Sequence, residues 1–196
     1  MHRRRGLLGL TFRGIFIVGV TLAFVHVLAA NPVSSWDATP GSVDISTSPA
    51  SAVLSFGGMA PGDSVARPLT VSNDGSLPLL YSVRSTTSED ALAAQLDMTI
   101  KTSVTKCSDA GFDRDGEVIY GPGDLGSTAG LELVGDPALG PDPGDRVLEA
   151  SASETLCIQV SLPLGTGNAF QGLTTETTLL LIAEQIPPAS SSPHSR

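Results

Sequence analysis

The chain has 196 residues, with 11 Lys and Arg against 20 Asp and Glu, and a net charge of −9. Four of the basic residues and none of the acids lie in residues 1–30, so the remainder holds 7 basic and 20 acidic side chains, a charge of −13. A chain this acidic repels nucleic acid and anionic lipid, which argues against either as a partner.

Residues 1–30 have the pattern of a secretory signal. Four arginines lie in residues 1–14, and residues 15–30 form an uncharged run of 16 residues that ends in Ala29-Ala30. A basic start, a short apolar core and small residues at its end predict cleavage near residue 30 and secretion to the medium or cell surface. The alternative is an uncleaved anchor, but the run is shorter than the roughly 20 residues that span a bilayer. The chain therefore meets the membrane only through this segment, before cleavage.

The remaining chain predicts one domain of short strands. After an extended leader at residues 31–41, apolar or alternating runs recur between turns rich in Gly, Pro, Ser and Asn, as in all-β domains. The leader has one large aromatic residue, Trp36, and the tail at residues 186–196 is too polar to fold. The predicted strands are at residues 42–47, 51–57, 65–73, 79–84, 96–100, 117–120, 130–134, 156–162 and 174–185.

Two local patterns refine this prediction. The Asn73-Asp-Gly75 turn between two strands predicts a β-hairpin over residues 65–84. Residues 88–95 are the one helical candidate, with Ser88 as its cap. The fold class expected for residues 42–185 is all-β, a jelly-roll-like antiparallel β-sandwich with one short connecting helix. Turn chemistry explains the remaining conspicuous residues, which are Pro61, Gly62, Asp63, Asn73, Gly75, Asn168, Gln171 and Gly172.

The two cysteines, Cys107 and Cys157, both lie in the exported part of the chain. Outside the cell, paired cysteines are the rule, and we predict a disulfide between them. Two free thiols remain the alternative. Cys157 lies on the opposite face of its strand from the apolar stripe of Leu156, Ile158 and Val160.

No catalytic constellation is present in the sequence. The three histidines, His2, His26 and His194, lie in the signal and the tail, and no HExxH motif occurs. A zinc peptidase or a Ser-His-Asp hydrolase would need a histidine in the domain, so we predict no enzyme activity and no cofactor. Acidic residues near a glycine form one weak Ca²⁺ candidate, for which a plain acidic loop is the alternative. They are Asp109, Asp113, Asp115 and Glu117.

Four segments in order resemble the TasA/camelysin family of secreted matrix-fibre and spore-coat-associated proteins, in a short actinobacterial form. They are GSVDIS at residues 41–46, MAPGDSVARPLTVSNDGSLPLLYSV at 59–83, ETLCIQVSLP at 154–163 and GNAFQGLTTETTLLLIAEQ at 167–185. The chain departs from the family's usual Thr-Asp pair after the signal, with Ser35-Trp36-Asp37 in its place.

The resemblance implies a jelly-roll sandwich that builds extracellular or cell-surface fibres. In such proteins an extended N-terminal segment, here about residues 33–47, completes the sheet of the next subunit. The expected partners are other copies of the chain or other matrix and surface proteins. Two alternatives stay open: a secreted endopeptidase, because some family members are described as metallopeptidases, and a monomeric module that binds Ca²⁺ or glycan through the loops at residues 107–145.

Overall fold

The structure is a computed structural model that describes residues 40–186. The predicted signal peptide, leader residues 31–39 and the tail beyond residue 186 lie outside the described residues. The described part belongs to one compact unit that begins at Thr39. Within residues 40–186, no helix has the length and hydrophobicity needed to cross a membrane.

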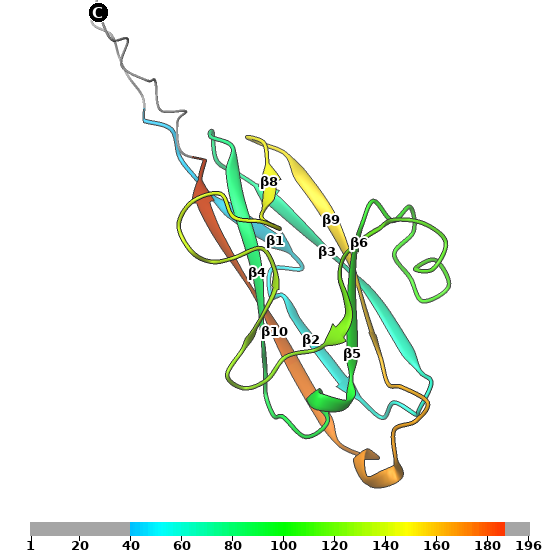
Figure 1. The fold of residues 1–196 in the computed structure, drawn as a ribbon. Coiled ribbons are helices and arrows are strands. Elements are labelled where there is room, and N and C mark those ends of the chain that lie inside the picture. The colour runs from blue at the N-terminus through cyan, green and yellow to red at the C-terminus, as the bar shows by residue number, and fades with distance from the viewer. Residues whose placement is uncertain (1–39, 187–196) are drawn as a thin grey trace, which may run out of the picture. The chain divides into compact units, whose positions relative to one another are not determined.

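Residues 40–186 form two antiparallel sheets (Figure 1). The first sheet has the order β1-β3-β9-β5-β6, and the second has the order β2-β10-β4-β7, with β8 pairing with β4 beside β7. The all-β sandwich expected from the sequence is confirmed. The strands are β1 (Ile45–Ser48), β2 (Val53–Gly57), β3 (Ser64–Asn73), β4 (Leu79–Thr87), β5 (Asp97–Thr102), β6 (Glu117–Asp124), β7 (Leu131–Val134), β8 (Arg146–Leu148), β9 (Ser153–Ser161) and β10 (Thr174–Gln185).

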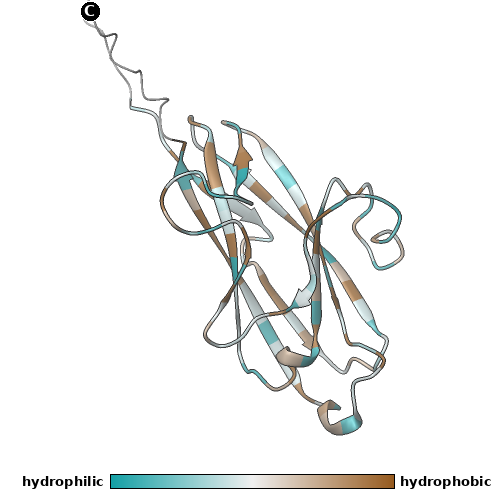
Figure 2. Cartoon of the chain, viewed as in Figure 1, coloured by the Kyte–Doolittle hydropathy of each residue, from teal (hydrophilic) through white to brown (hydrophobic). Residues whose placement is uncertain are grey.

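Alternation along the strands builds the core between the sheets. In β9, Leu156, Ile158 and Val160 are buried in the main core, while Cys157 lies in a separate cluster on the other face of the sheet. Figure 2 shows the resulting hydrophobic bands along the strands. The largest fully buried core side chains come from both sheets and from residues directly beside their strands, so the two inner faces share one core. They include Leu79, Tyr81, Leu96, Met98, Ile100, Leu125, Leu156 and Ile158.

The predicted hairpin over residues 65–84 is wrong. β3 pairs with β1 and β9 in the first sheet, whereas β4 pairs with β10, β7 and β8 in the second. Asn73 ends β3 with its side chain buried, and its Nδ2 donates to Leu77 O at 2.8 Å and to Leu148 O at 3.1 Å. At this end β3 is already paired with β1 on one side and β9 on the other, so β4 cannot pair with it. The Asn73 bonds hold the connection that carries the chain to the second sheet.

The helical prediction is corrected in length and in its cap. Residues 88–95 contain only a single 3₁₀ turn, Ala93–Gln95, and a second such turn at Asn168–Phe170 precedes β10. Ser88 does not cap the turn, since its hydroxyl accepts a hydrogen bond from Glu176 N. The carboxylate of Glu89 instead accepts from the backbone N–H groups of residues 91–93. Strand β8, three residues long, was not predicted.

Candidate functional site: the exposed strand edges

The four acidic residues of the Ca²⁺ candidate are not gathered into a site. Asp109 accepts a hydrogen bond from Ala66 N, and Asp115 accepts one from Thr105 N. The bonds from Thr105 hold the pKa of Asp115 below its ordinary value. Across residues 40–186, no group of three or more Asp, Glu, His or Cys side chains has the arrangement to hold a metal ion. Asp109 and Asp115 are thus each engaged by a backbone N–H group, Asp109 by one on β3 and Asp115 by one in its own loop.

Two of the three groups of predicted turn residues act within their own turns, whereas Asn73 also bonds to the β8 end. At Ala60–Asp63, Asp63 Oδ2 accepts from Ala60 N at 2.8 Å, and Gly62 has a φ of +95°, in the region that favours glycine. Near β10, Gln171 Nε2 donates to Asn168 Oδ1 at 3.2 Å, and Gly172 has a φ of +78°. Both groups shape connections between strands.

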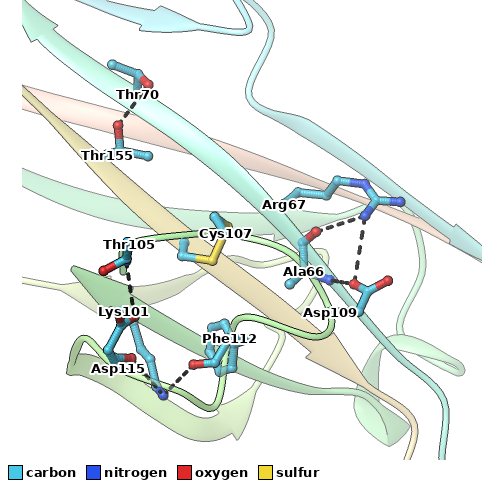
Figure 3. The surroundings of a disulfide bond; sticks show 11 residues. Ala66, Arg67, Thr70, Lys101, Thr105, Cys107, Asp109, Phe112, Asp115 and Thr155 are labelled. Atoms are coloured by element: carbon cyan, nitrogen blue, oxygen red, sulfur yellow. Dashed lines mark hydrogen bonds and ion pairs between the residues drawn. A yellow bond between two sulfur atoms is a disulfide. The ribbon is translucent and has the colours of Figure 1, made fainter. Parts of the chain in front are cut away.

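The predicted disulfide between Cys107 and Cys157 is present. It fastens the loop of residues 103–116, which connects β5 to β6, onto the outer face of β9 (Figure 3). Cys157, Ala66 and Phe112 are buried together in a small apolar cluster on that face. This loop is therefore held over the first sheet by a covalent bond and its own small core.

A buried polar group joins the two sheets. Tyr81 on β4 donates its hydroxyl to Glu154 Oε1 on β9 at 2.6 Å, and Arg146 on β8 pairs with Glu154 Oε2 at 2.7 Å. Burial, and then the bond to Glu154, raise the pKa of the Tyr81 hydroxyl. The bonds among Tyr81, Glu154 and Arg146 therefore link β4 and β8 of the second sheet to β9 of the first.

The feature with a capacity for binding is the side of β10 that β2 leaves uncovered. β2 covers residues 174–178 of β10, and Leu179 N then donates to Ala52 O at 2.8 Å. Successive peptide groups of a strand point to opposite sides, so the N–H and C=O groups of Leu181, Ala183 and Gln185 face the same way as those of Leu179. Among residues 40–186 no strand pairs with them. We call residues 180–185, seen from this side, the β10 edge.

An apolar groove lies beside the β10 edge. It opens between β1 of the first sheet and β10 of the second and has a volume of about 320 Å³. Leu179 and Leu181, whose side chains pack in or against the core, line its β10 side, so a strand laid along the β10 edge would direct every second side chain into the groove. The lining residues are Ile45, Ser46, Thr47, Ala50, Ala52, Leu179 and Leu181.

Proteins usually protect exposed edges with proline, lysine, bulges or short strands. Residues 180–185 contain no proline or lysine, and the carboxylate of Glu184 is engaged by Gly140 N at 2.8 Å. By contrast, the strands on the far side of the second sheet are short, with four residues in β7 and three in β8. Among residues 40–186, the β10 edge is thus a six-residue edge of the second sheet that has none of these protections.

Sequence reasoning did not locate this edge. The clear apolar pattern of residues 174–185 predicted the strand but not which neighbours it has, because its partners lie 90 or more residues earlier in the chain. The signal that could have helped is length: β10 has 12 residues and β2 has five, so part of β10 must extend past β2.

Comparison with known proteins shows only a distant likeness. No protein-family model and no curated protein matches the chain. One solved structure, the ASH / PapD-like domain of human CEP192 (PapD-like domain 7), is similar at 14% sequence identity. The match covers 83% of this chain and 99% of that chain, with a TM-score of 0.24.

Proposed function

We propose that the exported chain is a structural subunit of an extracellular or cell-surface fibre, in which the leader of one copy adds as a strand to the β10 edge of the next. The observation that carries this proposal is the unpaired β10 edge beside an apolar groove of about 320 Å³. In strand addition, main-chain hydrogen bonds supply affinity and alternate side chains in the groove supply specificity. Both elements of such an acceptor are present.

The leader supplies a suitable donor. Pro32 and Pro40 bracket residues 33–39, a run of seven residues that each carry a backbone N–H, long enough to follow the six-residue β10 edge. Trp36 and Ala38 are two residues apart and would face the groove together in an extended strand. The donor is shorter than the range of 33–47 expected from the family resemblance. Ile45–Ser48 is β1 of the subunit's own sheet, and Asp74 N and Ser76 N donate to Asp44 O and Ser42 O.

Three further features support an exported assembly protein. The disulfide is consistent with an oxidising compartment. The ordered segments described above resemble a family of matrix-fibre proteins. The peptidase alternative has no support from the residues, since no histidine occurs between residues 27 and 193.

The experiment is electron microscopy of negatively stained protein, comparing residues 31–196 with the same chain lacking residues 31–39. The deletion stops before Ser42 and Asp44, so the bonds that these residues make to the β3–β4 connection are kept. We expect fibres from the longer protein and monomers from the shorter one. Fibres from both proteins, or monomers from both, would contradict donation by the leader.

A pair of variants at one position tests the acceptor. Ala183→Pro removes an N–H that faces the open edge and leaves the pairing of β10 with β4 intact, because that ladder uses the opposite side of the strand. Ala183→Ser keeps the N–H and is the matched control. We expect Ala183→Pro to abolish fibres and Ala183→Ser to preserve them. Fibres from the proline variant would move the acceptor to another edge.

A further inference from the structure

The sandwich has a second groove, larger than the one beside β10. It lies between β2 and the first half of β3 and has a volume of about 420 Å³. β1 covers only residues 70–73 of β3, so within residues 40–186 no strand pairs with residues 64–69 on that side. A leader that fits the β10 edge would find a similar site here. The lining residues are Pro49, Val53, Leu54, Ser55, Phe56, Val65, Arg67 and Pro68.

The direction of the β3 peptide groups shows which residues form this second edge. Asn73 N donates to Ala152 O, on the β9 side of β3. Alternation therefore turns the odd-numbered residues of β3 toward β9 and the even-numbered residues toward the open side. The groups that an added strand would need here belong to Ser64, Ala66 and Pro68.

At this edge the backbone groups are already occupied. Ala66 N donates to Asp109 Oδ1 at 2.5 Å, and Ala66 O accepts from Arg67 Nη1 at 2.8 Å. Arg67 and Asp109 also lie 3.9 Å apart as an ion pair. The next edge-facing residue, Pro68, has no N–H to offer. Two consecutive edge-facing positions, Ala66 and Pro68, thus have no N–H available to an incoming strand, and Figure 3 shows the contacts of Ala66 with Arg67 and Asp109.

Asp109 reaches β3 from the loop of residues 103–116, which crosses β9 from the β5 side. The disulfide to Cys157 and the burial of Phe112 hold this loop on the sheet. Lys101 Nζ adds a hydrogen bond to Phe112 O at 2.8 Å and lies 4.5 Å from the centre of its ring. The position of Asp109 therefore depends on a loop that one covalent bond fastens.

We propose that residues 103–116 form an edge guard: the disulfide-fastened loop closes the β3 edge to the leader of a second copy and confines strand addition to β10. The identity of the strand that is excluded rests on the proposed function, whereas the guard itself is a property of the single subunit. Opening the disulfide releases Asp109, so that the Ala66 N–H becomes available. The β2–β3 groove then becomes a second acceptor that pairs through Ser64 and Ala66, since Pro68 still has no N–H, and this would allow branching or irregular association.

A dithiol reductant opens the guard by two thiol–disulfide exchanges. One reductant sulfur bonds to a cysteine sulfur as the Cys107–Cys157 bond breaks, and the released cysteine takes a proton. The second reductant sulfur then displaces the remaining cysteine, which takes the other proton. Two electrons pass to the protein, two cysteine thiols form, and the reductant becomes its cyclic disulfide.

Amide hydrogen exchange at Ala66 tests the guard without reference to assembly. Asp109→Ala removes the acceptor, and we expect the Ala66 amide to exchange about tenfold faster or more, with little change elsewhere in β3. Asp109→Asn keeps an oxygen at the same place and is the matched control, so its exchange should stay slow. Equal exchange in the native protein and Asp109→Ala would overturn the proposal.

Association is then measured by sedimentation velocity in the Ala183→Pro background, where the β10 edge is closed. With the native loop this protein should remain monomeric. Association is expected in this background after Asp109→Ala, and also after the double change Cys107→Ser with Cys157→Ser. In each of these variants, adding Ala66→Pro or deleting residues 31–39 should restore the monomer. Circular dichroism checks that each variant is folded, and Asp109→Ala keeps the test valid if loss of the disulfide unfolds the chain. If the Ala66 amide of Asp109→Ala exchanges freely and the protein still stays monomeric, the guard has no role in association.

Because β10 is closed in every arm, these results are independent of whether the native protein forms fibres. A native protein that forms no fibres, together with an Asp109→Ala variant that associates through residues 31–39, would refute the β10 acceptor and retain the guard. Native fibres that form through β10, together with an unchanged Asp109→Ala variant, would refute the guard alone.

Discussion

Tyr81 and Glu154 lie on different sheets and share a hydrogen bond of 2.6 Å. The same carboxylate pairs with Arg146, so one partly buried acid ties β9 of the first sheet to β4 and β8 of the second. Polar groups removed from water are stable only with their partners in place, and this group therefore sets the relative position of the sheets.

Replacing Glu154 by Ala should destabilise the fold by about 2 kcal/mol, because Arg146 and the Tyr81 hydroxyl both lose their acceptor. Urea unfolding followed by circular dichroism measures this change. The control is Glu132→Ala, which removes the pair with Arg84, where the side chains are 33% and 35% exposed. That variant should lose about 1 kcal/mol or less. Equal losses for the two variants would show that the Glu154 group has no special role.

The raised pKa of Tyr81 predicts sensitivity to alkali. A group whose pKa is higher in the folded state stabilises the fold fully below its unfolded pKa, about 10 for tyrosine, and loses this contribution as the pH rises. Stability should therefore fall above about pH 10, with tyrosinate absorbance from Tyr81 appearing only on unfolding. Tyr81→Phe should flatten this dependence. An unchanged pH profile in Tyr81→Phe would assign the loss to other groups.

Glu89 predicts a response to acid. Burial raises its pKa, but the hydrogen bonds that its carboxylate accepts, from Leu92 N first among the backbone groups, lower it more. A carboxylate with a lowered pKa stabilises the fold above its unfolded pKa and loses that contribution as the pH falls. Glu89→Gln should cost about 1 kcal/mol near neutral pH and less in acid. Glu117→Gln, at an exposed residue of β6, is the control and should have little effect.

Loss of the disulfide should lower stability substantially. Cys107 and Cys157 are 50 residues apart, and closing such a loop stabilises a fold by about 4 kcal/mol in the chain-entropy model. Thermal unfolding of the double serine variant measures the change, with the native protein in excess dithiol as a chemical equivalent. Agreement between the two assigns the effect to the bond. A loss in only the mutant would assign it to the serine side chains.

The parts of the fold that the sequence predicted have a strong local pattern. The stripe of Leu156, Ile158 and Val160 has the period of two that only a strand with one buried face shows, and the structure confirms it. The three-residue β8 has no such pattern, since its pairing with Leu79 and Tyr81 depends on the fold around it. Asn73-Asp-Gly75 favours a turn but does not say whether the next strand stays in the same sheet.

The candidate site was harder to predict because an edge is defined by what is missing beside it. Nothing in residues 180–185 alone shows that β2 stops short of them. Asp109 illustrates the same limit. In sequence it belongs to a group of acids near a glycine, whereas in the structure its partner is Ala66, 43 residues earlier.

Both grooves arise because the chain pairs with β3 of the first sheet through β1 and then crosses to pair with β10 of the second sheet through β2. β1 covers the second half of β3 and β2 covers the first half of β10, so the uncovered halves lie diagonally across the same flank of the sandwich. Moving the crossing point along the chain would fill one groove only by lengthening the other. The combined length of unpaired edge on β3 and β10 would therefore stay the same. Among residues 40–186, this topology therefore leaves about one strand's length of unpaired edge, part of it along β3 and part along β10.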